Sequence, residues 1–286
     1  MTNILLRWKN RIKNKSIVIY TNNQLSGSTE WDFTFYRIEA EDNGYVVKRF
    51  RVDPLSSGNK IRSFSGHSGR VYGVDVDSNG NVYSGSHDKT VKKTSSSGSV
   101  IWTFRERTGR VYYGVAVDSS GNVYSGSDDN TVKKISSSGN EIWSFGRYTN
   151  FLGDEVWSSG RHTNTVYDVA VDSKGNVYSG SGDGTVKKIN SSGNHVWTFR
   201  GHSGRVFGVF VDSNDNVYSA SDDQTVKKIN SSGNQVWSFS EHSGTMDGVA
   251  VDLNTNNVYT GSFDNTMKKI TSSGNDVWSF SGYVDG

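Results

Sequence analysis

Histidine and aspartate recur together through most of the chain, and these residue types can support acid–base chemistry or bind a metal ion. The recurring histidines, with Arg107 in the corresponding place of one further repeat, are His67, His162, His202 and His242. The recurring aspartates are Asp88, Asp129, Asp183, Asp223 and Asp264. Because each repeat supplies one residue of each kind, the histidines lie too far apart to share a tetrahedral metal ion. We therefore expect structural His–Asp sets that are hydrogen bonded within each repeat, and no metal site.

A second acidic motif, DSNGN at Asp77–Asn81, has the look of a calcium-binding loop. Its glycine comes too early for that loop, and no glutamate stands at the twelfth position, which the loop requires. Asn-Gly is the pair that a tight β-hairpin turn favours, since its central residues adopt positive φ. A hairpin turn therefore explains the motif fully.

Each repeat also carries two adjacent lysines within a segment that is typical of a β-strand. They are Lys92 and Lys93, Lys133 and Lys134, Lys187 and Lys188, Lys227 and Lys228, and Lys268 and Lys269. In one interpretation the lysine stems cover aromatic surface and their ammonium groups pair with aspartates of the next structural unit. In the other, the lysines form a cationic ring for a polyanion, such as a sulfated or acidic glycan or the acidic patch of a protein.

No set of residues in the sequence points to catalysis. We find no glycine-rich phosphate loop, no nucleophile elbow and no motif that brings an acid, a base and a nucleophile together. We therefore expect a protein that is not an enzyme, with no catalytic residues and no cofactor.

One repeat positions all of these residues. Residues 66–105 return four more times with little change, and one tryptophan per copy marks the register: Trp102, Trp143, Trp197, Trp237 and Trp278. A period of about 40 residues, with strand patterns in every copy and no helical pattern between them, is typical of a radial β architecture. In the first copy we expect four antiparallel strands, at 71–77, 81–86, 90–94 and 100–105. The predicted fold class is all-β, a β-propeller of about six four-stranded blades.

The side-chain pattern distinguishes the innermost strand from the outermost one. The strand at 71–77 carries Gly73, and Gly208 and Gly248 hold the same place in later copies. Glycine weakens the interior of a strand unless another backbone must approach closely, and strands crowd most at the axis of a propeller. We therefore expect this strand at the axis. The tryptophan strand belongs at the rim, where Trp and Phe on one face cover the neighbouring blade.

The repeats divide a propeller domain, residues 16–286, into segments. The clear repeats are 66–105, 106–146, 161–200, 201–240 and 241–280. Residues 16–65 form a degenerate first blade in our interpretation, because SSGNKIRSF matches SSGNEIWSF with Arg62 in the place of tryptophan. Five blades with a separate N-terminal hairpin are the alternative to six. We expect the last blade to pack against the first, by its face or through a strand borrowed from the N-terminal region.

An insertion at residues 147–160 interrupts the pattern. NEIWSFGRYTN at 140–150 is repeated as DEVWSSGRHTN at 154–164, although the neighbouring repeats already have full sets of strands. We expect a protruding candidate binding loop that carries Tyr148, Phe151 and Trp157. The alternative is an accidental duplication packed against the rim, since long insertions are well tolerated.

The first fifteen residues are basic and contain no acidic side chain. The residues that would make contacts are Arg7, Trp8, Lys9, Arg11, Lys13 and Lys15. We interpret residues 1–15 either as a docking arm that inserts into a partner or as a flexible or locally packed terminus. Their apolar run, Ile4–Leu6, is too short for a secretory signal.

Composition excludes some classes of partner. Among 286 residues, 31 are Lys or Arg and 29 are Asp or Glu, which gives a net charge of +2. This balance lacks the basic excess on which generic nucleic-acid binding depends, so we expect no nucleic-acid partner. The chain has no cysteine, hence no disulfide and no thiolate metal site. No apolar stretch is long enough for a membrane-spanning helix, so we expect no membrane insertion.

At residues 66–280 the repeat resembles two known propeller families. GHSGRV followed by SGSHDKT is similar to the WD repeat, in which a His, a Ser or Thr and an Asp form a hydrogen-bonded set with a Trp on the third strand. Here that tryptophan is replaced by Thr94, Ile135, Ile189, Ile229 and Ile270. The end of each repeat is similar to the quinoprotein-type, PQQ-like repeat, with a glycine four residues before the tryptophan, as in Gly139 and Trp143. The second resemblance suggests quinone-dependent dehydrogenases, but those resemble longer, eight-bladed and usually exported chains.

These resemblances and the missing catalytic set favour a rigid binding or structural module, present in several copies in an assembly. The chain is similar to compact repeat propellers of prokaryotes and their viruses. With its basic arm and without a signal peptide, it is expected to be a virion-associated structural or adsorption protein of a prokaryotic virus, assembled in the cytoplasm and bound to other virion proteins. The alternatives are a cytoplasmic WD-repeat-like scaffold for protein interactions and a lectin for surface glycan.

Overall fold

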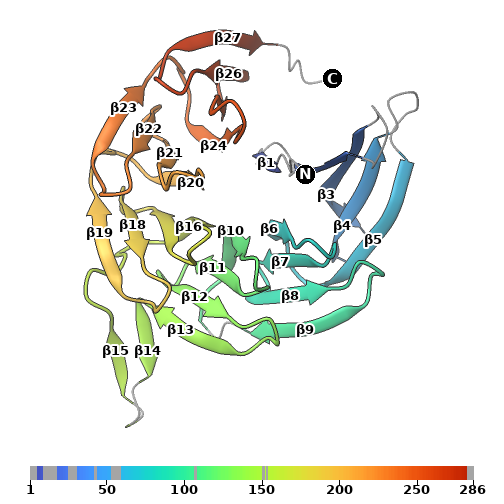
Figure 1. Cartoon of the computed structure of the whole chain (residues 1–286). Coiled ribbons are helices and arrows are strands. Elements are labelled where there is room, and N and C mark those ends of the chain that lie inside the picture. The colour runs from blue at the N-terminus through green and yellow to red at the C-terminus, as the bar shows by residue number, and fades with distance from the viewer. Residues whose placement is uncertain are drawn as a thin grey trace.

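In a computed structural model of the chain, the described residues are 5–8, 18–24, 31–41, 44–52, 59–105, 108–149, 152 and 154–281. Their side chains are described from Phe64 onward, apart from those of Tyr113, Tyr148 and Thr149. All regular structure in these residues is β-strand, labelled β1–β27 (Figure 1). None of these residues belongs to a helix of the length and apolar character that crossing a membrane requires. The prediction of an all-β, blade-based fold is confirmed.

The five clear repeats fold into five antiparallel sheets of four strands, each in sequence order. The first sheet holds β6 (Val71–Val76), β7 (Val82–Ser86), β8 (Thr90–Thr94) and β9 (Val100–Arg105). The second holds β10 (Val111–Val117), β11 (Val123–Ser127), β12 (Val132–Ile135) and β13 (Glu141–Phe145). The third holds β16 (Val166–Val171), β17 (Val177–Ser181), β18 (Val186–Ile189) and β19 (His195–Phe199). The fourth holds β20 (Val206–Val211), β21 (Val217–Ser221), β22 (Val226–Ile229) and β23 (Gln235–Phe239). The fifth holds β24 (Met246–Val251), β25 (Val258–Ser262), β26 (Thr266–Ile270) and β27 (Asp276–Ser281).

A sheet of five strands precedes these blades. It holds β1 (Leu5–Trp8), β2 (Val18–Gln24), β3 (Trp31–Glu41), β4 (Gly44–Val52) and β5 (Asn59–His67). The last four correspond to the degenerate blade. The first comes from the predicted arm, since the backbone of residues 5–8 pairs with β2 and lies beside β24 of the last blade. The remaining arm residues lie outside the described ones, as do the side chains of Arg7 and Trp8, so the docking role stays a prediction.

The first strands of successive blades lie side by side at the centre of the arc of sheets (Figure 1). A Cβ added to Gly114 would lie 2.9 Å from the backbone nitrogen of Val169, and one added to Gly208 would lie 3.4 Å from the Cα of Gly248. These glycines therefore stand where the backbones of two blades approach closely. This close approach is the feature from which the innermost position of the first strand of each blade was predicted. The rings of Tyr72, Tyr112, Tyr167 and Phe207 form a row across four blades, with successive centroids 5.2, 5.7 and 4.8 Å apart.

Two buried aspartates join innermost strands across blade boundaries. One carboxylate oxygen of Asp75 accepts a 2.8 Å hydrogen bond from the backbone N–H of Val117 in the next blade. Asp168 accepts a 3.1 Å hydrogen bond from the N–H of Val209 in the same way. Both side chains are more than 90% buried. The two carboxylates thus accept hydrogen bonds from backbone N–H groups that would otherwise be buried without an acceptor.

The insertion between the second and third blades is a hairpin of two strands, β14 (Arg147–Thr149) and β15 (Glu155–Trp157). It projects from the rim (Figure 1). Gly146 turns the chain into it with a φ of 119°, a conformation that glycine adopts readily. The guanidinium of Arg147 pairs with Glu155 across the strands at 2.9 Å. The segment predicted as a loop is therefore partly a regular β-hairpin.

Candidate functional site

The structure brings the predicted His–Asp sets together within single blades. In the first, Nδ1 of His67 lies 2.9 Å from Oδ2 of Asp88, and its Nε2 lies 2.9 Å from Oγ of Ser84. Thr90 Oγ1 lies 3.1 Å from the same Nδ1 and donates to Oδ1 of Asp88 at 2.6 Å. The same arrangement recurs with His–Asp distances of 2.8–3.0 Å in His162–Asp183, His202–Asp223 and His242–Asp264.

The second blade lacks the histidine of this set. Arg107, which holds its place in the sequence, lies outside the described residues. Thr108 instead donates to Oδ2 of Asp129 at 2.6 Å, and Thr131 donates to Oδ1 at 2.6 Å. The aspartate therefore keeps its role in organising the turn of its blade.

A neutral imidazole fits the hydrogen bonds of these sets, because it can donate from Nδ1 to the carboxylate and accept at Nε2 from the serine or threonine hydroxyl. Burial alone would raise the pKa of Asp88, Asp183 and Asp223, but hydrogen bonds from histidine, threonine and backbone N–H hold each pKa well below its usual range. In Asp264 the same balance lowers the pKa to about 2. Burial lowers the pKa of His162 and His242 against the opposing effect of their aspartates.

These shifts predict a fold that loses stability in acid. Below about pH 6.5 the unfolded chain protonates histidines that the fold keeps neutral, and below about pH 4 it protonates aspartates that the fold keeps ionised. Because the unfolded state binds more protons in both ranges, stability falls as the pH falls. We expect the melting temperature to drop by roughly 5 °C or more between pH 7 and pH 4. Thermal melts monitored by circular dichroism across this range measure it, and a flat or rising profile would contradict the assignment.

The Asp77–Asn81 turn has its carboxylate occupied by donors of the protein itself. Oδ1 of Asp77 accepts from the backbone N–H of Asn79 and of Asn81, at 3.0 and 2.9 Å. Oδ2 accepts from the Asn81 side chain at 2.8 Å and from the hydroxyl of buried Tyr83 at 3.0 Å. Burial and this aspartate raise the pKa of Tyr83 above its usual value. The motif thus ties the hairpin turn to the blade core, and the described residues contain no group of three or more potential metal ligands.

The paired lysines make most of their contacts within their own blade, although Lys133 also lies over the Phe104 ring of the preceding blade and Lys228 donates to the carbonyl of Ser272 in the next. The first of each pair donates to a hydroxyl on the outermost strand in four blades: Lys92 to Thr103, Lys187 to Thr198, Lys227 to Ser238 and Lys268 to Ser279. The second places its ammonium 5.2–5.9 Å from the centre of a tyrosine ring: Lys93 on Tyr83, Lys134 on Tyr124, Lys188 on Tyr178, Lys228 on Tyr218 and Lys269 on Tyr259. The stems do cover aromatic surface. The expected pairing of the ammonium groups with aspartates of the next blade is wrong, because these partners belong to the same blade. A cationic ring for a polyanion stays a prediction.

The rim tryptophan of each of the first four repeats binds the turn before the last strand of the next blade. Trp143 donates from its indole nitrogen to the carbonyl of Ser191 at 3.1 Å, and a Cβ added to Gly193 would lie 2.9 Å from the indole. Equivalent hydrogen bonds of 3.0 Å join Trp102 to Ser137, Trp197 to Ser231 and Trp237 to Ser272. The rim aromatics therefore hold neighbouring blades together.

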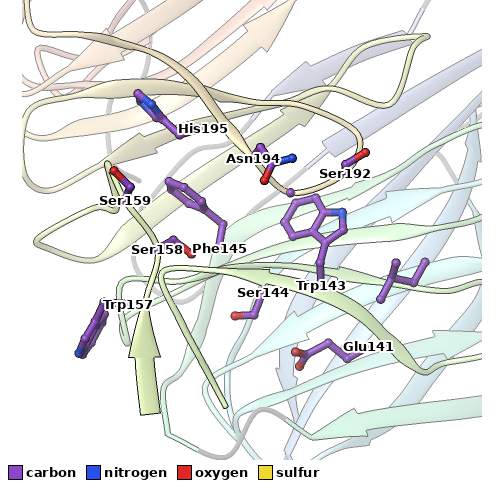
Figure 2. Close-up of a pocket in the computed structure, with 12 residues that line it drawn as sticks. Glu141, Trp143, Ser144, Phe145, Trp157, Ser158, Ser159, Ser192, Asn194 and His195 are labelled. Carbon is purple, nitrogen blue, oxygen red and sulfur yellow. The ribbon is translucent and has the colours of Figure 1, made fainter. Parts of the chain in front are cut away.

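A groove of about 700 Å³ opens where the β14–β15 hairpin meets the next blade (Figure 2). Its lining comes from three segments: 141–145 on β13, 157–159 at the end of β15 and just beyond it, and 192–195 in the turn that leads into β19. Trp143 and Phe145 project from β13 toward the 192–195 segment, while Trp157 stands at the outer edge (Figure 2). We call this site the hairpin groove.

His195 begins β19 of the third blade, next to the segment that leaves the hairpin, and was not singled out from the sequence. Its ring stacks on buried Phe145 with centroids 6.3 Å apart and planes 11° apart, and its Nε2 lies 2.7 Å from Thr198 Oγ1. A Cβ added to Gly160 would lie 2.9 Å from this ring, so the chain leaving the hairpin packs directly on it. Burial, together with the charge of Lys187, lowers the pKa of His195. The sequence does mark this residue: a histidine stands two residues before the rim tryptophan, where other repeats have Glu141, Gln235 and Asp276.

Exposed apolar side chains lie in the hairpin groove, at Ile142 and Trp157, and between the two strands of the hairpin, at Leu152. Ile142 is 51% exposed, Leu152 70% and Trp157 46%. The guanidinium of Arg161 lies 4.7 Å from the centre of the Trp157 ring and covers one of its faces. Of the predicted binding loop, Trp157 is thus at the surface. Tyr148 lies on β14 with its side chain outside the described part, and Phe151 is not among the described residues.

Two family models match parts of the chain. Residues 146–279 match the PQQ_2 family, described as outer membrane protein assembly factor BamB. Residues 58–93 match the WD domain, G-beta repeat. The comparison with curated proteins gave no match. These are the two families that the repeat resembles in sequence. The five clear repeats also fold into four-stranded sheets, as propeller blades do. The partial matches and the four-stranded sheets are consistent with a β-propeller repeat protein whose repeats are similar to both WD-type and PQQ-type repeats.

Proposed function

We propose that this β-propeller is a protein-interaction module that does not catalyse a reaction, and that it binds a partner polypeptide at the hairpin groove. WD repeats generally mediate contacts between proteins, which favours this class of function. The histidines and aspartates that could have served catalysis are instead bonded to each other and to hydroxyl groups inside the blades. Catalysis by a proton donor and acceptor needs groups that reach a substrate.

The single observation that carries the proposal is the exposure of Ile142 and Trp157, two large apolar side chains that both line the hairpin groove. Large apolar side chains that stay exposed together around a concavity are typical of a contact surface. Tryptophan contributes strongly to protein interfaces, because it buries a large rigid surface at little entropic cost. The blades beneath supply a fixed scaffold, so a partner would meet a surface that is already ordered.

Trp157→Ala tests this surface. Peptides are selected from a random display library on the wild-type chain, with the variant used for counter-selection. We expect selected peptides to bind the variant at least tenfold more weakly, a loss of about 1.4 kcal/mol. Fluorescence anisotropy measures both affinities, and thermal melts should be unchanged because the side chain is largely exposed.

The matched control is Ile101→Ala in the first repeat. Ile101 is 53% exposed and stands in the place that Ile142 holds, but no hairpin follows it. Peptide affinity should stay at the wild-type value in this variant. If no peptide is enriched, or if enriched peptides bind the Trp157→Ala variant as well as the wild type, the groove is not the interaction site.

For the biological setting we propose a virion-associated structural or adsorption protein of a prokaryotic virus, assembled in the cytoplasm. Support comes from the resemblance to compact viral propellers, from the basic residues 1–15 and from near-identical repeats that could multiply weak contacts. A cytoplasmic scaffold fits the repeats equally well. Mass spectrometry of purified particles, run beside a fractionated cell lysate, separates the two. Stoichiometric presence in particles supports the virion role, and recovery in a soluble cellular complex alone supports the scaffold.

A further inference from the structure

The chain holds two copies of the segment that forms the rim strand of the second blade. The first copy, EIWSF, is β13 (Glu141–Phe145), and the second, EVWSS, is residues 155–159. Trp143 keeps the spacing that the repeats show between the third strand and the rim tryptophan. Trp157 keeps the spacing of five residues between that tryptophan and the next histidine, here His162. Spacing along the sequence therefore permits either copy to serve as the rim strand.

The first copy makes contacts for which the second has equivalent side chains. β13 pairs with β12, Trp143 donates to the turn of the next blade, and Glu141 pairs with Lys133 at 2.8 Å. In the second copy, Trp157 stands in the place of Trp143, and Glu155 stands in the place of Glu141. These contacts do not distinguish the two copies.

Phe145 does distinguish them. It is 1% exposed and packs in the apolar cluster between the second and third blades, with Val132, Val166 and Ile189. The other clear repeats all have phenylalanine at this place, whereas the second copy has Ser159. Loss of a buried phenylalanine is among the most destabilising changes to a core. The position of the insertion matters less, because the cost of closing a loop varies slowly with its length.

The contacts that keep the second copy in the hairpin are at the surface. β14 and β15 have three residues each, and a two-stranded hairpin is marginally stable by itself. In the ion pair of Arg147 with Glu155, the glutamate side chain is 64% exposed, so the pair adds little stability. Trp157 is 46% exposed and has Arg161 over one face. Release of the second copy from the hairpin would therefore break few buried contacts.

We propose that the second blade has two interchangeable rim strands, residues 141–145 and 155–159, and that Phe145 selects the first. With the second in place, Trp157 would bind the turn of the next blade, and the insertion would precede the rim strand instead of following it. The hairpin groove is lined by both copies, so it exists only in the first arrangement. A ligand of the groove would stabilise that arrangement. The two-strand proposal itself does not depend on the proposed function.

An exchange of the two decisive residues tests the selection. We expect Phe145→Ser to lower the melting temperature by roughly 10 °C, because a buried ring is lost. Addition of Ser159→Phe should restore most of this loss, since the second copy then carries the phenylalanine and becomes the rim strand. The matched control adds Ser159→Phe to Phe199→Ser, in a blade that has no second copy, and should show no restoration. A double variant no more stable than Phe145→Ser, or equal restoration in both pairs, would overturn the proposal.

Oxidative footprinting with peptide mass spectrometry shows which copy occupies the rim. In the wild type we expect faster oxidation of Trp157, which is 46% exposed, than of Trp143, which is half-buried and rests on Gly193. In the Phe145→Ser, Ser159→Phe variant the order should be reversed. If stability is restored while Trp157 is still oxidised faster, the added ring stabilises the hairpin itself and the proposal fails.

Discussion

His162→Ala is expected to lower the free energy of unfolding by about 3 kcal/mol, among the largest effects of any side chain in the blades. The imidazole is fully buried and bonded to Asp183 Oδ2 at 3.0 Å and to Ser179 Oγ at 2.8 Å. Its removal leaves a nearly buried carboxylate and a buried hydroxyl short of a partner, together with a cavity. Urea denaturation followed by tryptophan fluorescence measures the change.

The second blade offers the matched control for this substitution. Thr108→Ala removes one hydrogen bond to Asp129, the corresponding carboxylate, but from an exposed position. We expect a loss of about 1 kcal/mol or less there. A His162→Ala variant that is no less stable than Thr108→Ala would mean that water replaces the imidazole and that the His–Asp set adds little to the fold.

Gly193→Ala is expected to cost about 3 kcal/mol of unfolding free energy for two separable reasons. The residue has a φ of 88°, which an L side chain adopts only with strain. The added methyl would also lie 2.9 Å from the indole of Trp143, which rests on the peptide and cannot move away without losing its hydrogen bond to Ser191. Differential scanning calorimetry of the variant gives the loss.

Gly175→Ala, in the same blade, separates backbone strain from the clash. Gly175 has a φ of 78°, but its Cβ would lie at an ordinary 3.4 Å from Ser191. The fourth blade already places Asp215 at this position with a φ of 62°, so a side chain is tolerated there. We expect a cost of about 1 kcal/mol. Equal losses in the two variants would show that the tryptophan contact contributes nothing to the penalty at Gly193.

The blades could be predicted from the sequence because their determinants are local and repeated. Each determinant acts over a few residues. Strand alternation recurs in all five copies, the glycine of the innermost strand in four, and a glycine in the turn that follows this strand in three. The His–Asp sets could also be named, since both partners stand at fixed places in the repeat. The strand formed by residues 5–8 could not, because it depends on pairing with β2 across a segment that carries no turn signal.

Contacts between blades were harder to foresee than contacts within them. Asp75 and Asp168 do the same work, capping an amide of the next blade, but they stand at different places in the repeat, and Asp168 replaces a glycine. Their role follows from how closely two backbones approach, a distance that no local pattern encodes. The hairpin groove has the same origin, because it forms where Phe145, Trp157 and His195 from three segments meet.

The tryptophan and aspartate contacts between blades all run in one direction along the chain. At the four junctions between clear repeats, the rim tryptophan of one blade reaches the backbone of the blade that follows, and at two of them a buried aspartate does the same. The second, third and fourth repeats therefore each carry both halves of the tryptophan contact, the ring for the next blade and the turn for the previous one. A unit added by duplication would satisfy both of its neighbours without a compensating substitution, so the length of such an array can change in whole units while every joint stays intact.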